Sequence, residues 1–195
     1  MVGGGVLHPR ILAARNLKIL KLGGKVSIDS NKLGAVQIGF GHVGIVDNQH
    51  CRALWENNGN IVFSGTAHMG PGTRIVNTGE LRIGSDFCIN AATEIICYKK
   101  ISFGSEVLIS WDCLIMDTDF HRVITLKDGR HVNADEAIAI GNHVWIGCRS
   151  TILKGSLIPS DSVVAAGSII YKKYSAENAI YSSNGKIKDS ITWKH

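Results

Sequence analysis

Residues 140–170 read IGNHVWIGCRSTILKGSLIPSDSVVAAGSII, and an aliphatic side chain returns at every sixth position. This row consists of Ile140, Ile146, Ile152, Ile158, Val164 and Ile170. Compact side chains follow four positions later, as Val144, Ser150, Ser156, Ser162 and Ser168. Neither a helix period of about 3.6 nor a strand alternation of two produces a period of six. A parallel β-helix does, because each coil places an equivalent residue inward at the same corner.

The same spacing occurs earlier in the chain. A first short row contains Phe63, Met69 and Ile75. After a shift of two residues, a longer row follows with Ile83, Ile89, Ile95, Ile101, Val107 and Cys113. We expect all of these side chains to be buried in one continuous column, where each Val, Leu or Ile contributes about 1.5–3 kcal/mol.

The repeats predict a single domain over residues 1–195. Residues 1–60 are less regular, and segments such as LKILKL and GAVQIGFGHVGIV predict strands of irregular N-terminal coils. The regular β-helix is expected over 61–172, interrupted by a protruding loop at about 116–139. Residues 173–195 form a short basic C-terminal tail. A long interruption in a repeat protein projects from one face, where binding is often found.

Composition narrows the classes of function. The chain has 195 residues, 45% hydrophobic and 19% charged, which is typical of a globular domain. The net charge of +5 suits a polyanionic ligand, but no Lys/Arg cluster interleaved with aromatic residues indicates nucleic-acid binding. The five cysteines are odd in number and form no C-x-x-C pair, so neither a disulfide framework nor a zinc site is expected.

The location follows from the same features. The N-terminal segment MVGGGVLHPRILAARNLKIL is interrupted by charged residues, and no stretch reaches the length of an apolar membrane span. We therefore expect a cytoplasmic protein without an integral membrane segment, although a peripheral membrane location stays open.

The segment IGNHVWIGCRSTILKGSLIPSDSVVAAGSIIYKK resembles the C-terminal coils of the hexapeptide-repeat acyltransferases. The resemblance covers roughly residues 60–190 and is closest to the sugar and polysaccharide O-acetyltransferases, such as the galactoside and maltose acetyltransferases. It implies an all-β, left-handed parallel β-helix assembled as a homotrimer, with acetyl-CoA bound between neighbouring subunits. The implied acceptor is a sugar or a polysaccharide precursor, including one for lipopolysaccharide.

The interrupting loop carries the main catalytic candidate, His121, in the sequence DTDFH. Acetyl transfer to a hydroxyl group requires a base, and an imidazole has a suitable pKa near neutrality. The resemblance places a catalytic histidine at this position, although this segment is one residue longer than in the galactoside enzyme. Asp119 or Asp117 could orient the imidazole, and Asp117 is also a candidate for substrate binding. Asn90 aligns with an asparagine that orients the acceptor in that enzyme.

The other candidates concern the two substrates. Trp111 and Asp112 stand just before the loop, where an indole can stack on a sugar ring and a carboxylate can bind hydroxyl groups; here the residue types differ from the family pattern. The resemblance implies acetyl-CoA contacts for Trp145, Cys148, Ala166, Lys172 and Lys186. Gly185 stands where the family commonly has proline, which leaves the course of the tail at Lys186 open. No metal is expected.

Several alternative functions are consistent with parts of the sequence. Cys88, Cys97 and Cys148 show no paired base in the sequence, and Cys113 occupies a core position, so direct transfer is favoured over a covalent acyl-cysteine. The γ-class carbonic anhydrases share the repeat, but their close histidine pair at i, i+5 is missing from the repeats. A non-catalytic scaffold is a further alternative. An N-acetyltransferase acting on an amino sugar or another amine also stays open.

Overall fold

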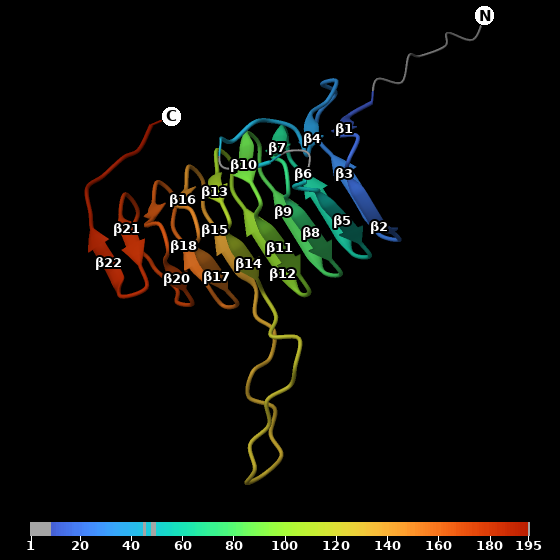
Figure 1. Ribbon diagram of the computed structural model, residues 1–195. Coiled ribbons are helices and arrows are strands. Elements are labelled where there is room, and N and C mark those ends of the chain that lie inside the picture. Colours follow the sequence, from blue (N-terminus) through green and yellow to red (C-terminus); the bar gives the residue numbers. More distant parts are fainter. Residues whose placement is uncertain (1–8, 45, 48–49, 195) are drawn as a thin grey trace, which may run out of the picture.

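The computed structural model describes residues 9–44, 46–47 and 50–194, which form a left-handed parallel β-helix (Figure 1). Its strands lie in three sheets that we call A, B and C. Sheet A contains β1 (Ile11–Ala13), β4 (Val36–Ile38), β7 (Ala67–Met69), β10 (Phe87–Ala91), β13 (Leu108–Trp111), β16 (Trp145–Ile146), β19 (Val163–Val164), β21 (Ile180–Ser182) and β22 (Gly185–Lys188).

Sheets B and C complete the three sides of the coil. Sheet B contains β2 (Lys18–Leu22), β5 (Leu54–Asn57), β8 (Arg74–Asn77), β11 (Glu94–Cys97), β14 (Leu114–Met116), β17 (Thr151–Leu153) and β20 (Ile169–Ile170). Sheet C contains β3 (Lys25–Ile28), β6 (Asn60–Phe63), β9 (Glu80–Ile83), β12 (Lys100–Phe103), β15 (Ile138–Ile140) and β18 (Leu157–Ile158). Successive coils pair in parallel, and the antiparallel pair β21–β22 closes sheet A at its C-terminal end.

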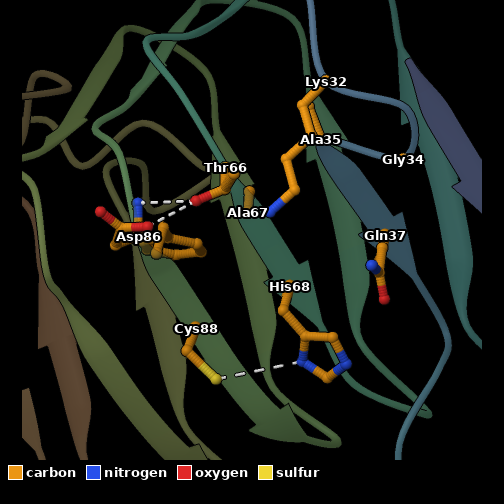
Figure 2. A pocket seen from close by; sticks show the side chains of 10 residues that line it. Lys32, Gly34, Ala35, Gln37, Thr66, Ala67, His68, Asp86 and Cys88 are labelled. Atoms are coloured by element: carbon orange, nitrogen blue, oxygen red, sulfur yellow. Dashed lines mark hydrogen bonds between the residues drawn. The ribbon is translucent and has the colours of Figure 1, made fainter. Parts of the chain in front are cut away.

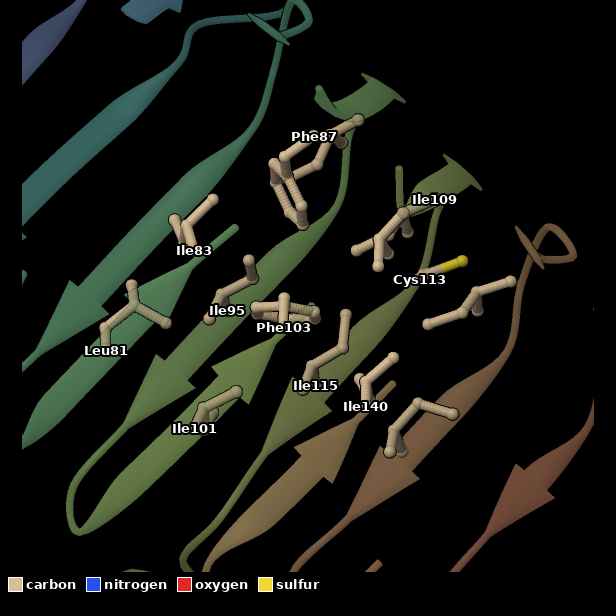
Figure 3. Packing of buried hydrophobic residues seen from close by; sticks show 14 of the residues in the cluster. Leu81, Ile83, Phe87, Ile95, Ile101, Phe103, Ile109, Cys113, Ile115 and Ile140 are labelled. Carbon is tan, nitrogen blue, oxygen red and sulfur yellow. The ribbon is translucent and has the colours of Figure 1, made fainter. Parts of the chain in front are cut away.

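The predicted rows are buried, and they form the core of the coil. Every residue of the three rows is at most 4% exposed. Figure 3 shows side chains such as Ile95, Ile101 and Ile115 pointing into the space that the three sheets enclose. The second row does not follow one column, however. Sheet C carries two neighbouring columns of inward side chains. Ile83 belongs to one column, because it pairs with Phe103, and Ile101 belongs to the other, because it pairs with Leu81. The second row therefore crosses from one column to the next.

The crossing has a simple cause at the corner between sheets B and C. In the middle coils, from β6 to β12, Ile61 pairs with Leu81 and Leu81 with Ile101, so each coil there advances by 20 residues. In the C-terminal coils Ile140 pairs with Ile158 and Ile146 with Val164, an advance of 18. The two additional residues lie between sheets B and C, and they account for the shift of two that separates the first two rows.

Polar side chains support this wider corner from inside. Asn57 and Asn77 are buried, and the Asn77 amide donates to Asn57 Oδ1 at 2.7 Å. Asn57 Oδ1 also accepts from the Gly59 N–H at 3.2 Å. A Cβ atom on Gly59 would lie 2.2 Å from the carbonyl oxygen of Gly79, so the stacked turns require glycine there.

The protruding loop lies where it was expected. It connects β14 to β15 over residues 117–137 and extends far from the stack of strands (Figure 1). An antiparallel bridge between Ile124 and His131 gives it a hairpin-like path. No helix that is long and apolar enough to cross a membrane occurs among the described residues.

The burial of Ile152 gives a direct test of the core column. The Ile152→Ala variant should lose about 2–5 kcal/mol of unfolding free energy, because the deletion leaves a cavity between packed coils. The Ile152→Asp variant should fail to fold, because it buries an unpaired charge. Circular dichroism and urea unfolding would measure both. Thr151→Asp is the matched control, since Thr151 points outward on the same strand; equal stability of the two Asp variants would contradict the packing model.

Candidate active site

One group of predicted residues gathers on sheet A and at its corner with sheet B. Asn90 points outward from β10, and Trp145 points outward from β16. Trp111 ends β13, and Asp112 follows at the corner with a φ of 56°. The side chain of Arg149, one coil further on, approaches Asp112 at 3.8 Å. Residues that lie far apart in sequence therefore share one edge of the β-helix.

The backbone around Cys148 and Ala166 lies at the same corner. The Gly167 N–H donates to the carbonyl oxygen of Cys148 at 2.8 Å, which stacks one turn on the next. A Cβ atom on Gly147 would lie only 2.6 Å from the Ala166 nitrogen. The two turns are thus in close contact, and they continue the surface that begins at Trp145.

The Trp145 indole is fixed by residues that the sequence did not single out. Its Nε1 donates to Ser110 Oγ at 3.1 Å, and Ser110 is buried on β13. The ring of Trp193 lies 6.3 Å from the Trp145 ring. Trp193 also stacks on His143 at 4.4 Å and donates to the carbonyl oxygen of His143 at 2.9 Å. The C-terminal tail therefore returns to the outer face of sheet A beside Trp145.

A cavity of about 270 Å³ lies on the outer face of sheet A, with His68 and Cys88 in its lining (Figure 2). Cys88 Sγ lies 4.0 Å from His68 Nδ1 and 3.9 Å from Asn90 Oδ1. Lys32, Gln37 and Thr66 supply further polar side chains to this lining. The expectation that Cys88 lacks a paired base is therefore corrected, because coil stacking brings His68 beside it from the preceding coil.

Burial keeps the Cys88–His68 pair uncharged. It raises the pKa of the Cys88 thiol and lowers the pKa of the His68 imidazole. Both shifts oppose a thiolate–imidazolium pair, the form that makes a cysteine a strong nucleophile. Burial also raises the pKa of Cys97 to about 12 and that of Cys113 to about 11. The structure therefore favours neutral thiols at these three positions.

A second group of predicted residues lies at the corner between sheets B and C. His121 is exposed in the loop, and its backbone N–H donates to the carbonyl oxygen of Asp119 at 2.6 Å. The Asp119 carboxylate pairs with Lys154 and accepts from Asn133 Nδ2 at 2.8 Å. These hydrogen bonds lower the pKa of Asp119. Asp119 thus contacts Lys154 and Asn133, and its role in orienting the imidazole stays a prediction.

Asp117 has a different environment from the one its sequence position suggested. It is 0% exposed, and its carboxylate accepts from the backbone N–H groups of Tyr98, Lys99 and Lys100 at 2.6–2.9 Å. It occupies the place that Asn57 and Asn77 hold in earlier coils, because Ile96 pairs with Met116. This geometry favours support of the turn over a contact with a sugar.

The two predicted lysines lie apart from each other. Lys172 follows β20 at the corner between sheets B and C, and its ammonium lies 5.2 Å from the centre of the Tyr171 ring. Lys186 lies on β22 at the C-terminal end of sheet A and pairs with Asp189 at 2.7 Å. That hydrogen bond raises the pKa of Lys186. Both side chains are exposed cations, but only Lys186 extends the sheet that carries Trp145.

The predicted residues therefore divide between two sides of the coil. Sheet A and its corner with sheet B hold Asn90, Trp111, Asp112, Trp145, Cys148 and Ala166. The opposite corner holds His121, Asp119, Asp117 and Lys172. Among the described residues, no group of three His, Cys, Asp or Glu side chains could hold a metal ion.

Some relevant residues were missed from the sequence. Ser110 stands 20 residues after Asn90, so the coil period could have placed the two side by side. Asn133, Lys154 and Trp193 gave no comparable signal, because their contacts depend on the folded paths of the loop and the tail.

The sequence shares segments with proteins named as acetyltransferases. It is 41% identical over 56 residues to a polysialic acid O-acetyltransferase of Neisseria meningitidis, which is 29% of this chain and 26% of that protein. It is 33% identical over 94 residues to the galactoside O-acetyltransferase of Escherichia coli K12, which is 47% of this chain and 45% of that protein. The matched segments thus span less than half of either enzyme.

A longer match runs along almost the whole chain. An uncharacterized 24.8 kDa protein in the cps region of Klebsiella pneumoniae is 28% identical over 193 residues, which is 97% of this chain and 84% of that protein. No protein-family model matches the sequence.

Solved structures show the same fold. The polySia-specific acetyltransferase NeuO superposes with a TM-score of 0.63 at 19% identity, covering 92% of this chain and 89% of that one. A variant of AntD, an N-acyltransferase from Bacillus cereus in complex with dTDP-4-amino-4,6-dideoxyglucose and coenzyme A, gives 0.53 at 16% identity, covering 95% and 82%.

The buried carboxylate of Asp117 leads to a stability prediction. Asp117→Ala should lower the unfolding free energy by about 1–3 kcal/mol, because the turn at residues 98–100 loses its hydrogen-bond acceptor. Urea unfolding would measure the loss, with the exposed Asp29→Ala as control. If the two variants unfold at the same urea concentration, the proposed role of Asp117 in the turn is incorrect.

Proposed function

We propose that this chain, a member of the hexapeptide-repeat sugar acyltransferase family, moves an acetyl group from acetyl-CoA to a hydroxyl group of a sugar or polysaccharide precursor. One observation carries the proposal: residues that match the family's acceptor and cofactor positions gather along one edge of sheet A. The sequence relatives named as O-acetyltransferases act on polysialic acid and on galactosides, which supports a glycan acceptor.

The chemistry assigns His121 as the general base. A neutral imidazole takes the proton of the acceptor hydroxyl while its oxygen attacks the thioester carbon of acetyl-CoA. The tetrahedral intermediate then collapses, the C–S bond breaks, and the CoA thiolate leaves and takes up the proton that His121 had accepted, which regenerates the neutral base. The new C–O bond completes the acetyl ester. Asn90 orients the acceptor, and Trp111 and Asp112 bind its ring and hydroxyl groups.

The cofactor lies along the coils that follow Trp145 in this proposal. The compact turns at Cys148 and Ala166 offer backbone groups to the pantetheine arm, so their side-chain identity matters little. The ammonium group of Lys186, on the same sheet, pairs with a CoA phosphate as a point charge, and Lys172 supplies a second such charge from a neighbouring chain. The net charge of +5 has the sign that such an anionic co-substrate requires.

The division of the site between two sides supports a homotrimer. In a three-sided coil, sheet A lies opposite the corner from which the loop with His121 departs (Figure 1). His121 cannot reach Asn90 and Trp145 of its own chain across the packed core. Three copies around an axis would bring the loop of one chain to the sheet A edge of the next. Each active site would then use two chains.

The proposed compartment is the cytoplasm, with a peripheral membrane location also open. The five cysteines are free, as is usual for proteins of a reducing compartment. The polysaccharide role draws support from the match to a polysialic acid O-acetyltransferase.

An amine acceptor is the second candidate. The same fold occurs in AntD, which is named an N-acyltransferase and was solved in complex with dTDP-4-amino-4,6-dideoxyglucose and coenzyme A. An amine needs the same removal of a proton during attack on the thioester. A panel of sugars and nucleotide sugars that differ only in a hydroxyl or amino group would decide between the two acceptors.

The base assignment predicts the behaviour of His121→Ala. Its kcat with the best acceptor of the panel should fall by a factor of about 10²–10⁴, because no other group removes the proton. Thiol release from acetyl-CoA would measure the rate, and the exposed His42→Ala is the control. Cys88→Ala should keep the wild-type kcat if transfer is direct. A full loss in Cys88→Ala with an active His121→Ala would point to a covalent acyl-cysteine.

The shared site predicts complementation between inactive chains. His121→Ala and Asn90→Ala should each be inactive alone, yet a mixed trimer refolded from both should regain activity. Some of its sites would combine an intact His121 from one chain with an intact Asn90 from the next. Activity that stays at the level of the separate variants, in a trimer shown to be mixed by mass, would contradict a site between chains.

A further inference from the structure

The base of the loop is fastened by the side chain of Asn133. Its Nδ2 donates to Asp119 Oδ2 and to the carbonyl oxygen of His121, both at 2.8 Å. Its Oδ1 accepts from the Val123 N–H at 2.6 Å. Asn133 is half-buried although it lies in the loop. One amide side chain therefore ties the returning strand of the loop to the residues on both sides of His121.

Lys154 connects this arrangement to the coil. It follows β17 at the corner above the loop, and its ammonium group pairs with the Asp119 carboxylate. It also donates to the carbonyl oxygen of Asn133 at 2.7 Å. The Lys154 side chain is only 18% exposed, so water competes little for these charge-assisted hydrogen bonds. The loop is thus held by the rigid stack of strands as well as by itself.

The backbone beside His121 has an unusual conformation that needs such support. Phe120 has a φ of 60°, in the left-handed region that large side chains rarely adopt. Its ring makes an edge-on contact with Tyr98, with ring centres 5.1 Å apart. Its N–H donates to Thr118 Oγ1 at 3.1 Å. A conformation of this kind persists only where the surroundings determine it.

We propose that Lys154 and Asn133 are positioning residues for His121, which hold the loop so that the imidazole is presented in one fixed place. This inference rests on the proposed function, in which His121 is the general base. In a catalytic triad a carboxylate holds the histidine directly. Here Lys154 and Asn133 would fix the position of His121 indirectly, by holding the loop that carries it. Asp119 acts here as the link between the two, through its carboxylate.

Kinetics of Lys154→Met and Asn133→Ala would test the proposal in the full-length protein. We expect kcat to fall between about tenfold and about a hundredfold, because small displacements of a catalytic group cost rate. The KM values for acetyl-CoA and for the acceptor should stay within about twofold of wild type, since the proposed function assigns neither residue to substrate binding. Lys154→Arg keeps the ion pair and should restore kcat. Lys127→Met, at the exposed tip of the same loop, is the matched control.

A readout apart from activity keeps the test independent of the base assignment. The ring resonances of isotope-labelled histidine report the surroundings of His121, with His121→Ala identifying its signal. In Lys154→Met this signal should move toward the shift of a mobile histidine, and in Lys154→Arg it should return.

The outcomes separate the two claims. If His121→Ala abolishes turnover but Lys154→Met has full kcat, the proposed function stands and the positioning role fails. If His121→Ala keeps its kcat, the base assignment fails. Separately, an unchanged His121 signal in Lys154→Met would overturn the positioning role. Equal losses in Lys154→Met and Lys127→Met would also overturn it, because they would indicate a general effect of loop charge.

Discussion

The fold depends on one constraint: each coil must place its inward side chains directly above those of the coil before it. Backbone hydrogen bonds between successive coils run in parallel and in register, so a change of register at one strand would turn its aliphatic side chains outward. Ile75, Ile95 and Ile115 show the result, since each pairs with the next on sheet B and each is buried. The surface inherits this order, because outward side chains such as His68 and Cys88 are stacked by the same pairing.

Residues at the corners adopt a left-handed backbone conformation, with positive φ, because of the same constraint. Glu106, His143 and Asp161 follow one another on successive coils where sheet C passes to sheet A, and all three have φ between 50° and 58°. Ala92, Asp112 and Arg149 repeat this at the corner between sheets A and B, with φ between 48° and 58°. Such a conformation costs about 1–2 kcal/mol for a residue other than glycine. The burial of the aliphatic column offsets that cost, so the corners can hold residues other than glycine.

The sequence predicts the core well and the site only in part. A spacing of six identified the buried rows, because burial at a corner depends on a local repeat. It also located the loop, since the repeat stops there. The side-chain partners within the site could not be predicted in this way. Asp117 looks like a loop residue in sequence, yet pairing with β11 places it beneath a turn. Asp119 stands two residues from His121, but the ammonium of Lys154 lies 35 residues away in sequence and attracts its carboxylate.

The corner between sheets B and C is one of the places where the chain tolerates changes of length. Phe103 pairs with Ile140, so the coil that contains the loop advances by 37 residues, whereas its neighbours advance by 20 or 18. All three lengths fit the same ladder, because the additional residues leave between two sheets and the strands on either side keep their register. Segments could therefore be inserted, removed or exchanged at this corner without disturbing the core. In evolutionary terms, the body of the protein can stay fixed while this loop diverges.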